Sequence, residues 1–118
     1  MSSMTVVLLS SDLTVLSRVE GAATRVGQTV RSASGEALAV ELCKDDDTRT
    51  LVVDLSMQSV DPASLINQMR ANEGSRTRVV AFGPHVHEQR LVAAREAGCD
   101  LVVSRGQFFS QLETILTG

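Results

Sequence analysis

The sequence predicts one α/β domain in which five strands alternate with five helices around a parallel sheet. Short runs of aliphatic and β-branched residues, typical of buried parallel strands, recur along the chain. A segment with apolar residues at three- and four-residue spacing, as on one face of a helix, follows each run. Strands joined by helical crossovers form a sheet covered on both faces, so residues 1–118 are expected to make a single domain.

The first unit begins with the uninterrupted apolar strand Thr5–Ser10. Either Ser11 or Asp12 then predicts the N-cap of a helix that starts at Leu13, and Gly27 predicts a left-handed stop. The expected buried positions of this helix are Leu16, Val19, Ala23 and Val26.

The second unit has the weakest pattern. A strand is predicted over 29–33 and a helix over Glu36–Lys44. The acidic run Asp45–Asp47 is interpreted as a solvated loop, because consecutive carboxylates repel one another unless a rigid frame holds them. The expected apolar stripe of the helix is Ala37, Leu38, Glu41 and Leu42.

The third unit contains a short apolar strand, Thr50–Leu55, that ends on the carboxylate Asp54. After a loop, Asp61 predicts an N-cap and Pro62 the first helical position. Gly74 is expected to end this helix, whose apolar face would consist of Leu65, Ile66 and Met69.

The last two units follow the same order. A strand is predicted over Arg78–Gly83 and a helix over His85–Ala97, which would bury Leu91, Val92 and Ala94 and end at Gly98. A fifth strand, Leu101–Val103, leads into one final helix. Its apolar face is expected to hold Phe108 or Phe109, together with Leu112, Ile115 and Leu116.

Composition excludes several classes of partner and compartment. Three Phe, no Trp, no Tyr and a net charge of −3 do not suit a base-stacking, phosphate-binding surface, so no nucleic acid is expected. Neither a signal peptide nor a run long enough to span a membrane is recognised. Cys43 and Cys99 lack a pairing or metal motif and are interpreted as plain buried thiols, which favours a reducing cytoplasm.

Catalytic motifs are also missing from the sequence. Glycine-rich dinucleotide or P-loop signatures and the HExxH zinc motif do not occur. A serine nucleophile would need a positioned histidine, and the two histidines, His85 and His87, lie together at the start of the fourth helix. Their spacing also places them on different helix faces, unsuited to joint metal ligation. We therefore expect a protein that is not an enzyme.

Three stretches resemble the receiver (CheY-like) domain of two-component response regulators. They are Leu51–Leu55, Ala97–Phe108 and Glu36–Leu38, and the likeness extends over essentially the whole chain. A Rossmann-like or a flavodoxin-like winding would each suit the alternating units. The resemblance implies the flavodoxin-like (βα)5 winding with strand order 2-1-3-4-5, whose working residues lie at the carboxyl ends of the strands.

The resemblance assigns the phosphoacceptor position to Asp54. The family's acidic pair, which helps to hold Mg²⁺, corresponds to Ser10 and Ser11, with Asp12 one residue later. Hydroxyls are neutral and weaker ligands than carboxylates, so no cofactor is expected; if Mg²⁺ bound, Asp12 and Asp54 would hold it. Asp54 is alternatively a structural carboxylate that Arg105 or loop N–H groups stabilise.

Other family positions also differ. The Thr or Ser at the end of the fourth strand corresponds to Gly83, the Lys after the fifth strand to Arg105 and the following Pro to Gly106. The aromatic switch residue corresponds to Val102. The chain thus resembles the family in its fold, whereas several residues that serve phosphorylation in the family are replaced by other residue types in this sequence.

The resulting hypothesis is an atypical receiver-like signalling module that acts through protein contact without conventional Mg²⁺-dependent phosphorylation. The partner would be another signalling protein, either a histidine kinase or an output protein, with a homodimer as a further option. The alternatives are a true phosphoacceptor that uses Asp54, a flavodoxin-like cofactor-binding domain and an unrecognised enzyme. The expected interaction face comprises His85, His87, Arg90, Phe108 and Phe109.

Overall fold

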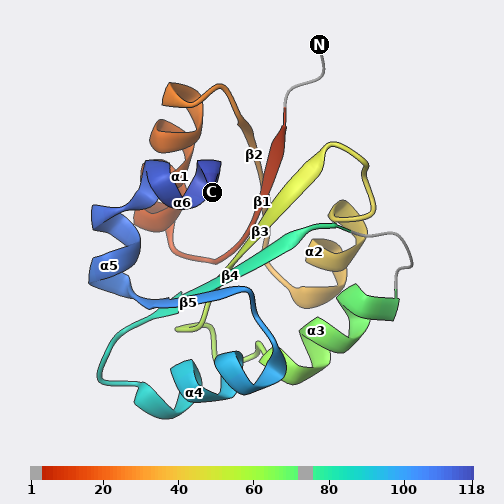
Figure 1. Cartoon of the computed structure of the whole chain (residues 1–118), viewed down its shortest axis with the longest axis vertical. Coiled ribbons are helices and arrows are strands. Elements are labelled where there is room, and N and C mark those ends of the chain that lie inside the picture. Colours follow the sequence, from red (N-terminus) through yellow and green to blue (C-terminus); the bar gives the residue numbers. More distant parts are fainter. Residues whose placement is uncertain (1–3, 72–75) are drawn as a thin grey trace.

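Five parallel strands form one sheet in the order β2-β1-β3-β4-β5, as the flavodoxin-like winding predicts (Figure 1). The computed structural model describes residues 4–71 and 76–118. The strands are β1 (Thr5–Leu9), β2 (Thr29–Ala33), β3 (Thr48–Asp54), β4 (Arg78–Gly83) and β5 (Leu101–Ser104).

Helices cover both faces of the sheet. In Figure 1, α1, α5 and α6 lie on one side, whereas α2, α3 and α4 lie on the other. The helices are α1 (Leu13–Arg25), α2 (Glu36–Leu42), α3 (Pro62–Ala71), α4 (Glu88–Ala97), α5 (Arg105–Ser110) and α6 (Leu112–Thr117). None of these helices in the described part of the chain is long and apolar enough to cross a membrane.

The core has two halves, one on each face of the sheet. Successive strand residues point to opposite faces, so Val7 packs with α2, α3 and α4, whereas Leu8 packs with α1, α5 and α6. Both are completely buried, as the unbroken apolar pattern of the first strand predicts. On the α1 face, the ring of Phe82 stacks on Phe108 with centroids 4.1 Å apart.

Most predicted helix ends are confirmed by hydrogen bonds or backbone angles. Asp12, rather than Ser11, caps α1, and Asp61 accepts a hydrogen bond from the Ala63 N–H at the start of α3. Gly27 and Gly98 adopt φ of 75° and 101°, the left-handed conformation that favours glycine after a helix. The predicted stop at Gly74 lies outside the described residues.

The second unit differs from its prediction in detail. Helix α2 buries Ala39, and Cys43 directly after it is also buried. Of the predicted stripe, Leu42 packs partly buried against the core, whereas Ala37, Leu38 (48% exposed) and Glu41 are exposed, so the stripe is corrected at these three positions. Several adjacent residues of this short helix are apolar, and its sequence therefore does not determine which face turns inward. Strand β3 begins earlier than predicted, at Thr48, whose buried hydroxyl donates to the carbonyl of Leu42.

Two helix predictions near the C-terminal end are also corrected. Helix α4 starts at Glu88 rather than at His85, because a turn closed by the His87 N–H and the Pro84 carbonyl precedes it. Val92, expected to be buried, is 39% exposed. The final helix is divided into α5 and α6 at Gln111, whose φ of −123° leaves the helical range.

The two cysteines are free thiols in the fold. Cys43 is buried and Cys99 half-buried. Burial disfavours the charged thiolate and raises the pKa of Cys43 to about 12 and that of Cys99 to about 11. Both thiols are therefore protonated at neutral pH, in agreement with the predicted structural role. The run 45–47 forms a loop, also as predicted.

Candidate functional site

The predicted rim residues gather at the carboxyl ends of neighbouring strands. Ser10 follows β1, Asp54 ends β3, Gly83 ends β4 and Arg105 follows β5. Strands β1 and β3 are adjacent although β2 lies between them in sequence, so the chain reverses its winding here. In open parallel sheets, such a switch point is where ligands and chemistry are found.

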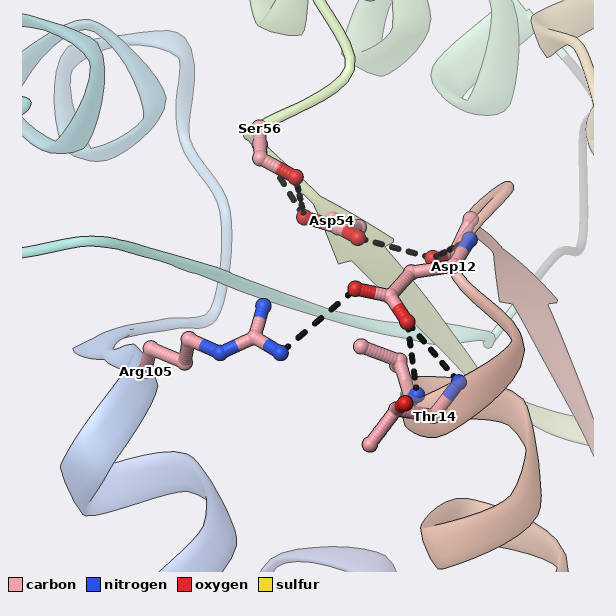
Figure 2. A network of polar contacts seen from close by, with 7 residues as sticks. Asp12, Thr14, Asp54, Ser56 and Arg105 are labelled. Carbon is pink, nitrogen blue, oxygen red and sulfur yellow. Dashed lines mark hydrogen bonds and ion pairs between the residues drawn. The ribbon is translucent and has the colours of Figure 1, made fainter.

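The Asp54 side chain lies at the centre of this rim and is only 1% exposed. Its Oδ2 accepts a 2.7 Å hydrogen bond from the Ser10 hydroxyl. Its Oδ1 accepts from the backbone N–H and the hydroxyl of Ser56, at 3.0 and 2.6 Å (Figure 2). Three neutral donors therefore satisfy this buried carboxylate, as a buried charge requires.

The hydroxyl of Ser10 has a second partner that defines its orientation. Its oxygen accepts a 3.1 Å hydrogen bond from the backbone N–H of Asp12 while its proton is donated to Asp54. Ser10 therefore links the β1–α1 loop to the end of β3. Ser11, its exposed neighbour, has no such link among the contacts of the described residues.

Asp12 serves the helix that it precedes. Its Oδ1 accepts hydrogen bonds from the N–H groups of Thr14, at 2.8 Å, and Val15, at 3.3 Å. Its Oδ2 forms a 3.5 Å ion pair with Arg105 (Figure 2). The backbone donors of Val15 and Thr14, followed by the Arg105 charge, lower the pKa of the Asp12 carboxyl.

The expected pairing of Arg105 with Asp54 is therefore corrected. In the described part of the chain, the carboxylate within ion-pair distance of Arg105 is that of Asp12. The guanidinium carbon of Arg105 also lies 5.1 Å from the ring centre of Phe109. The physical reason is depth: Asp54 is buried beneath the rim, whereas Arg105 remains partly exposed. The alternative stabilisation by a loop N–H, from Ser56, is confirmed.

Gly83 occupies a crowded position. A Cβ at this residue would lie 3.1 Å from the Leu55 Cβ and 3.8 Å from the Leu91 Cδ2. The absence of a side chain therefore allows close packing of β4 against the end of β3 and against α4. Val102, at the predicted switch position, is half-buried and packs into the α2–α4 half of the core.

Arg90 has a role that the sequence does not indicate. From the first turn of α4, its guanidinium donates to the carbonyls of Leu55, Met57 and Val60 at 2.7, 3.0 and 2.9 Å. These carbonyls belong to the loop that follows Asp54, and the Met57 carbonyl also accepts from the Val60 N–H. We therefore correct its assignment to the interaction face, because this guanidinium is bound within the molecule.

The other members of the predicted interaction face are distributed differently. His85 and His87 are exposed beside the start of α4, and their contact with a partner remains a prediction. Phe108 is completely buried, so it cannot belong to an exposed surface. Phe109 is half-buried, packs edge-on against Phe108 and lies 4.2 Å beneath the guanidinium carbon of Arg18.

The donor groups at the rim do not match the ligand set of a magnesium ion. Mg²⁺ requires near-octahedral oxygen ligands and is normally held by carboxylates. Here both oxygens of Asp12 are engaged by helix N–H groups and Arg105, and Ser10 supplies a neutral hydroxyl. Within residues 4–71 and 76–118, no cluster of three or more acidic, histidine or cysteine side chains could hold a metal.

Solved structures of receiver domains share this architecture. A response regulator from Thermotoga maritima superposes with a TM-score of 0.76 at 19% identity, over 98% of this chain and 96% of that chain. The receiver domain of a sensor histidine kinase from Pseudomonas aeruginosa has a magnesium ion coordinated in its active-site cleft. It superposes with a TM-score of 0.81 at 16% identity, over 98% of this chain and 96% of that chain. A CheY-like receiver domain from Methylobacillus flagellatus superposes with a TM-score of 0.75 at 15% identity, over 98% of each chain.

The sequence matches neither a family model nor a curated protein. At these identities the structural likeness establishes the fold, which is that of response-regulator receiver domains, and leaves the chemistry of the rim to be argued from its own residues.

Proposed function

From this receiver fold, we propose a signalling module that acts through contact with another protein and does not use conventional Mg²⁺-dependent phosphorylation. The partner is another signalling protein, a histidine kinase or an output protein, in the cytoplasm. In this proposal, Asp54 is a structural carboxylate and the chain is not an enzyme.

One observation carries the proposal: neutral hydroxyl and N–H donors occupy both oxygens of the buried Asp54. Phosphoryl transfer to a carboxylate needs an accessible nucleophilic oxygen and a cation that neutralises the incoming phosphoryl oxygens. At the two positions where the resemblance would put acidic ligands, this chain has Ser10 and Ser11. The hydrogen bonds to both oxygens of Asp54 therefore favour a structural role for this carboxylate.

The residues that would couple phosphorylation to a change at the protein surface are also missing. The resemblance would place a phosphoryl-binding hydroxyl at Gly83 and an aromatic switch at Val102. Gly83 has no hydroxyl, and a Cβ at this residue would lie 3.1 Å from the Leu55 Cβ. Instead, Arg90 ties α4 directly to the loop after Asp54, independently of any phosphoryl group. These contacts support the proposal that the position of α4 does not depend on phosphorylation of Asp54.

The competing hypothesis, phosphorylation of Asp54, is tested by intact mass. The protein is incubated with Mg²⁺ and a small-molecule phosphodonor, alongside Asp54→Asn as control. The proposal expects both masses to stay unchanged. A gain of one phosphoryl group by the unmodified sequence, lost in Asp54→Asn, would overturn it.

A further inference from the structure

A surface hollow lies beside α1, at the break that separates α5 from α6. Helix α1 packs against α6 on one face of the sheet (Figure 1). The hollow measures about 520 Å³ and is lined by Ser17, Arg18, Gly21 and Arg25 of α1 and by residues 109–114. Its size is typical of a site for a small molecule. We call this space the α1 hollow.

Arg18 provides the α1 hollow with a guanidinium that has no acidic partner. Among the described residues, it has neither an ion pair nor a hydrogen-bond acceptor. Its guanidinium carbon lies 4.2 Å from the ring centre of Phe109, a contact that holds the side chain in place. By contrast, Arg105, which also lies against Phe109, is paired with Asp12. The N–H donors of Arg18 are therefore ordered and available to an anion.

Arg25 brings a second guanidinium into the same hollow. Its backbone lies about 10 Å further along α1 than that of Arg18, but helical side chains lean toward the N-terminus of their helix. Its Nη1 accordingly lies 3.5 Å from the position that a Cβ would take at Gly21. The Nε of Arg25 pairs with Glu113 of α6, whereas Nη1 and Nη2 have no acceptor among the described residues. Gly21 thus leaves open the space beneath a guanidinium with spare donors.

The charges around the α1 hollow favour an anion. Its lining contains two arginines and one glutamate, so its net charge is +1, whereas the whole chain carries −3. Two other charged residues belong to α1, α5 and α6. Glu20 does not line the hollow, because it is turned about 100° around the helix from Gly21. The charge of Arg105 is balanced by its ion pair with Asp12.

We infer that the α1 hollow binds a sugar phosphate through Arg18 and Arg25. A phosphate monoester is tetrahedral and carries a charge of about −2 at neutral pH, so it can accept hydrogen bonds from guanidinium groups on two sides. A planar carboxylate is matched by the fork of a single guanidinium. The inference goes beyond the proposed function, because it adds a small-molecule ligand at a site whose lining does not include Asp54.

The rest of the lining indicates the body of the ligand. A phosphate group fills only part of the hollow, and Ser17, Ser110 and Gln111 add hydroxyl and amide groups to its walls. Such groups form hydrogen bonds with the hydroxyls of a sugar. A nucleobase would need an aromatic ring on which to stack, but the guanidinium groups of Arg18 and Arg105 already lie against Phe109. A sugar body is therefore favoured over a nucleoside.

The probes are ribose 5-phosphate, ribose and inorganic phosphate. Each is titrated into the ¹⁵N-labelled protein at low ionic strength to about 10 mM, where weak binding is measurable. We expect ribose 5-phosphate to shift the amide resonances of Gly21 and Ser110 saturably. Inorganic phosphate should bind at least about threefold more weakly, because it lacks the hydrogen bonds of the sugar, and ribose should leave both resonances in place.

Variants of the hollow test the assigned contacts. Arg18→Gln should weaken binding of ribose 5-phosphate about tenfold, through loss of a charge-assisted hydrogen bond. Arg95→Gln removes the same charge from an exposed position of α4 on the opposite face of the sheet, and this control should have no effect. Glu113→Gln should strengthen binding about threefold, because it removes a negative charge and releases Arg25.

Gly21→Ala separates binding from folding. Its methyl group would occupy the floor of the hollow in contact with Nη1 of Arg25, so ribose 5-phosphate should bind more weakly. The same change should raise the Tm, because alanine is favoured over glycine inside a helix. Weaker binding by a more stable variant cannot result from unfolding.

Three outcomes would overturn the inference: no binding of ribose 5-phosphate at about 10 mM, equally tight binding of inorganic phosphate, or binding that Arg18→Gln leaves unchanged. Shifts confined to Leu55 and Ser56 would also overturn it, because they would place the anion at Asp54. Phosphorylation of Asp54 would contradict the proposed function while leaving the result at the α1 hollow intact.

Discussion

The hydroxyl of Ser10 donates a 2.7 Å hydrogen bond to Oδ2 of Asp54. It joins the ends of β1 and β3 at the point where the resemblance would place an acidic group beside the phosphoacceptor. A carboxylate in that place would repel Asp54 unless a cation lay between them, whereas the hydroxyl stabilises Asp54 directly. The same position thus changes from a metal ligand to a hydrogen-bond donor.

Replacing Ser10 by alanine should destabilise the fold. Ser10→Ala leaves Asp54 with one buried oxygen unpaired and removes the acceptor of the Asp12 N–H, a loss of about 1–3 kcal/mol in the free energy of unfolding. Urea denaturation measures this change. The exposed neighbour provides the control, and Ser11→Ala should stay within about 0.5 kcal/mol. Equal effects of the two variants would contradict the structural role of the Ser10 hydrogen bond.

Introducing an acid at the same position should create a cation response. Ser10→Asp puts two carboxyl groups side by side, so the variant should be less stable without Mg²⁺. Saturating Mg²⁺ should then raise its Tm by roughly 5 °C, whereas the unmodified sequence and Ser10→Asn, a neutral control, should not respond. Thermal melts with and without Mg²⁺ decide this, and a shift of the same size in the unmodified sequence would refute the argument.

Arg90 should be important for the stability of the rim. Arg90→Met keeps an apolar stem but removes the guanidinium donor from the carbonyls of Leu55, Met57 and Val60, of which Met57 retains the Val60 N–H, and this should cost about 2–4 kcal/mol. Amide exchange should accelerate in the loop between β3 and α3. Arg95→Met, in the exposed part of the same helix, is the matched control and should change stability little. Unchanged exchange in the loop of Arg90→Met would be evidence against the anchoring role.

Gly83 and Gly106 should respond to alanine in opposite directions. The Cβ of Gly83→Ala would lie 3.1 Å from the Leu55 Cβ, which is attached to a backbone hydrogen-bonded to Phe82, so a loss of about 1–2 kcal/mol is expected. Nothing lies within 4 Å of the Gly106 Cβ position in α5, where alanine should gain up to about 1 kcal/mol. Denaturant unfolding of both variants measures the difference. A neutral Gly83→Ala would show that the position can accept a side chain.

The sequence predicted the strands better than it predicted the rim contacts. Buried strands are short and rich in β-branched residues, so runs such as the one ending at Asp54 could be recognised locally. The sequence offered Ser11 and Asp12 as N-caps of α1, and the hydrogen bonds that the Asp12 side chain accepts identify Asp12 as the cap. In contrast, the partner of Arg105 depends on how deeply Asp54 lies, which local sequence does not specify.

Arg90 shows why long-range contacts escaped prediction. Its three carbonyl acceptors lie 30 to 35 residues earlier in the chain, and carbonyls carry no sequence signature. The buried face of α2 could not be predicted for another reason. Leu38 and Ala39 are both apolar, and only packing determines that Ala39 turns inward. Sequence pattern thus indicates elements and their order, whereas the site depends on tertiary packing.

The most direct test of the structural role of Asp54 is the binding of beryllofluoride, a stable mimic of a phosphoryl group, in the presence of Mg²⁺. This mimic avoids the hydrolysis that can hide a short-lived aspartyl phosphate. The amide resonances of Leu55 and Ser56 report on Asp54, because the Ser56 N–H donates to its carboxylate. We predict that beryllofluoride with Mg²⁺ leaves both resonances in place; a saturable new set of resonances, absent from Asp54→Asn, would contradict the proposed function.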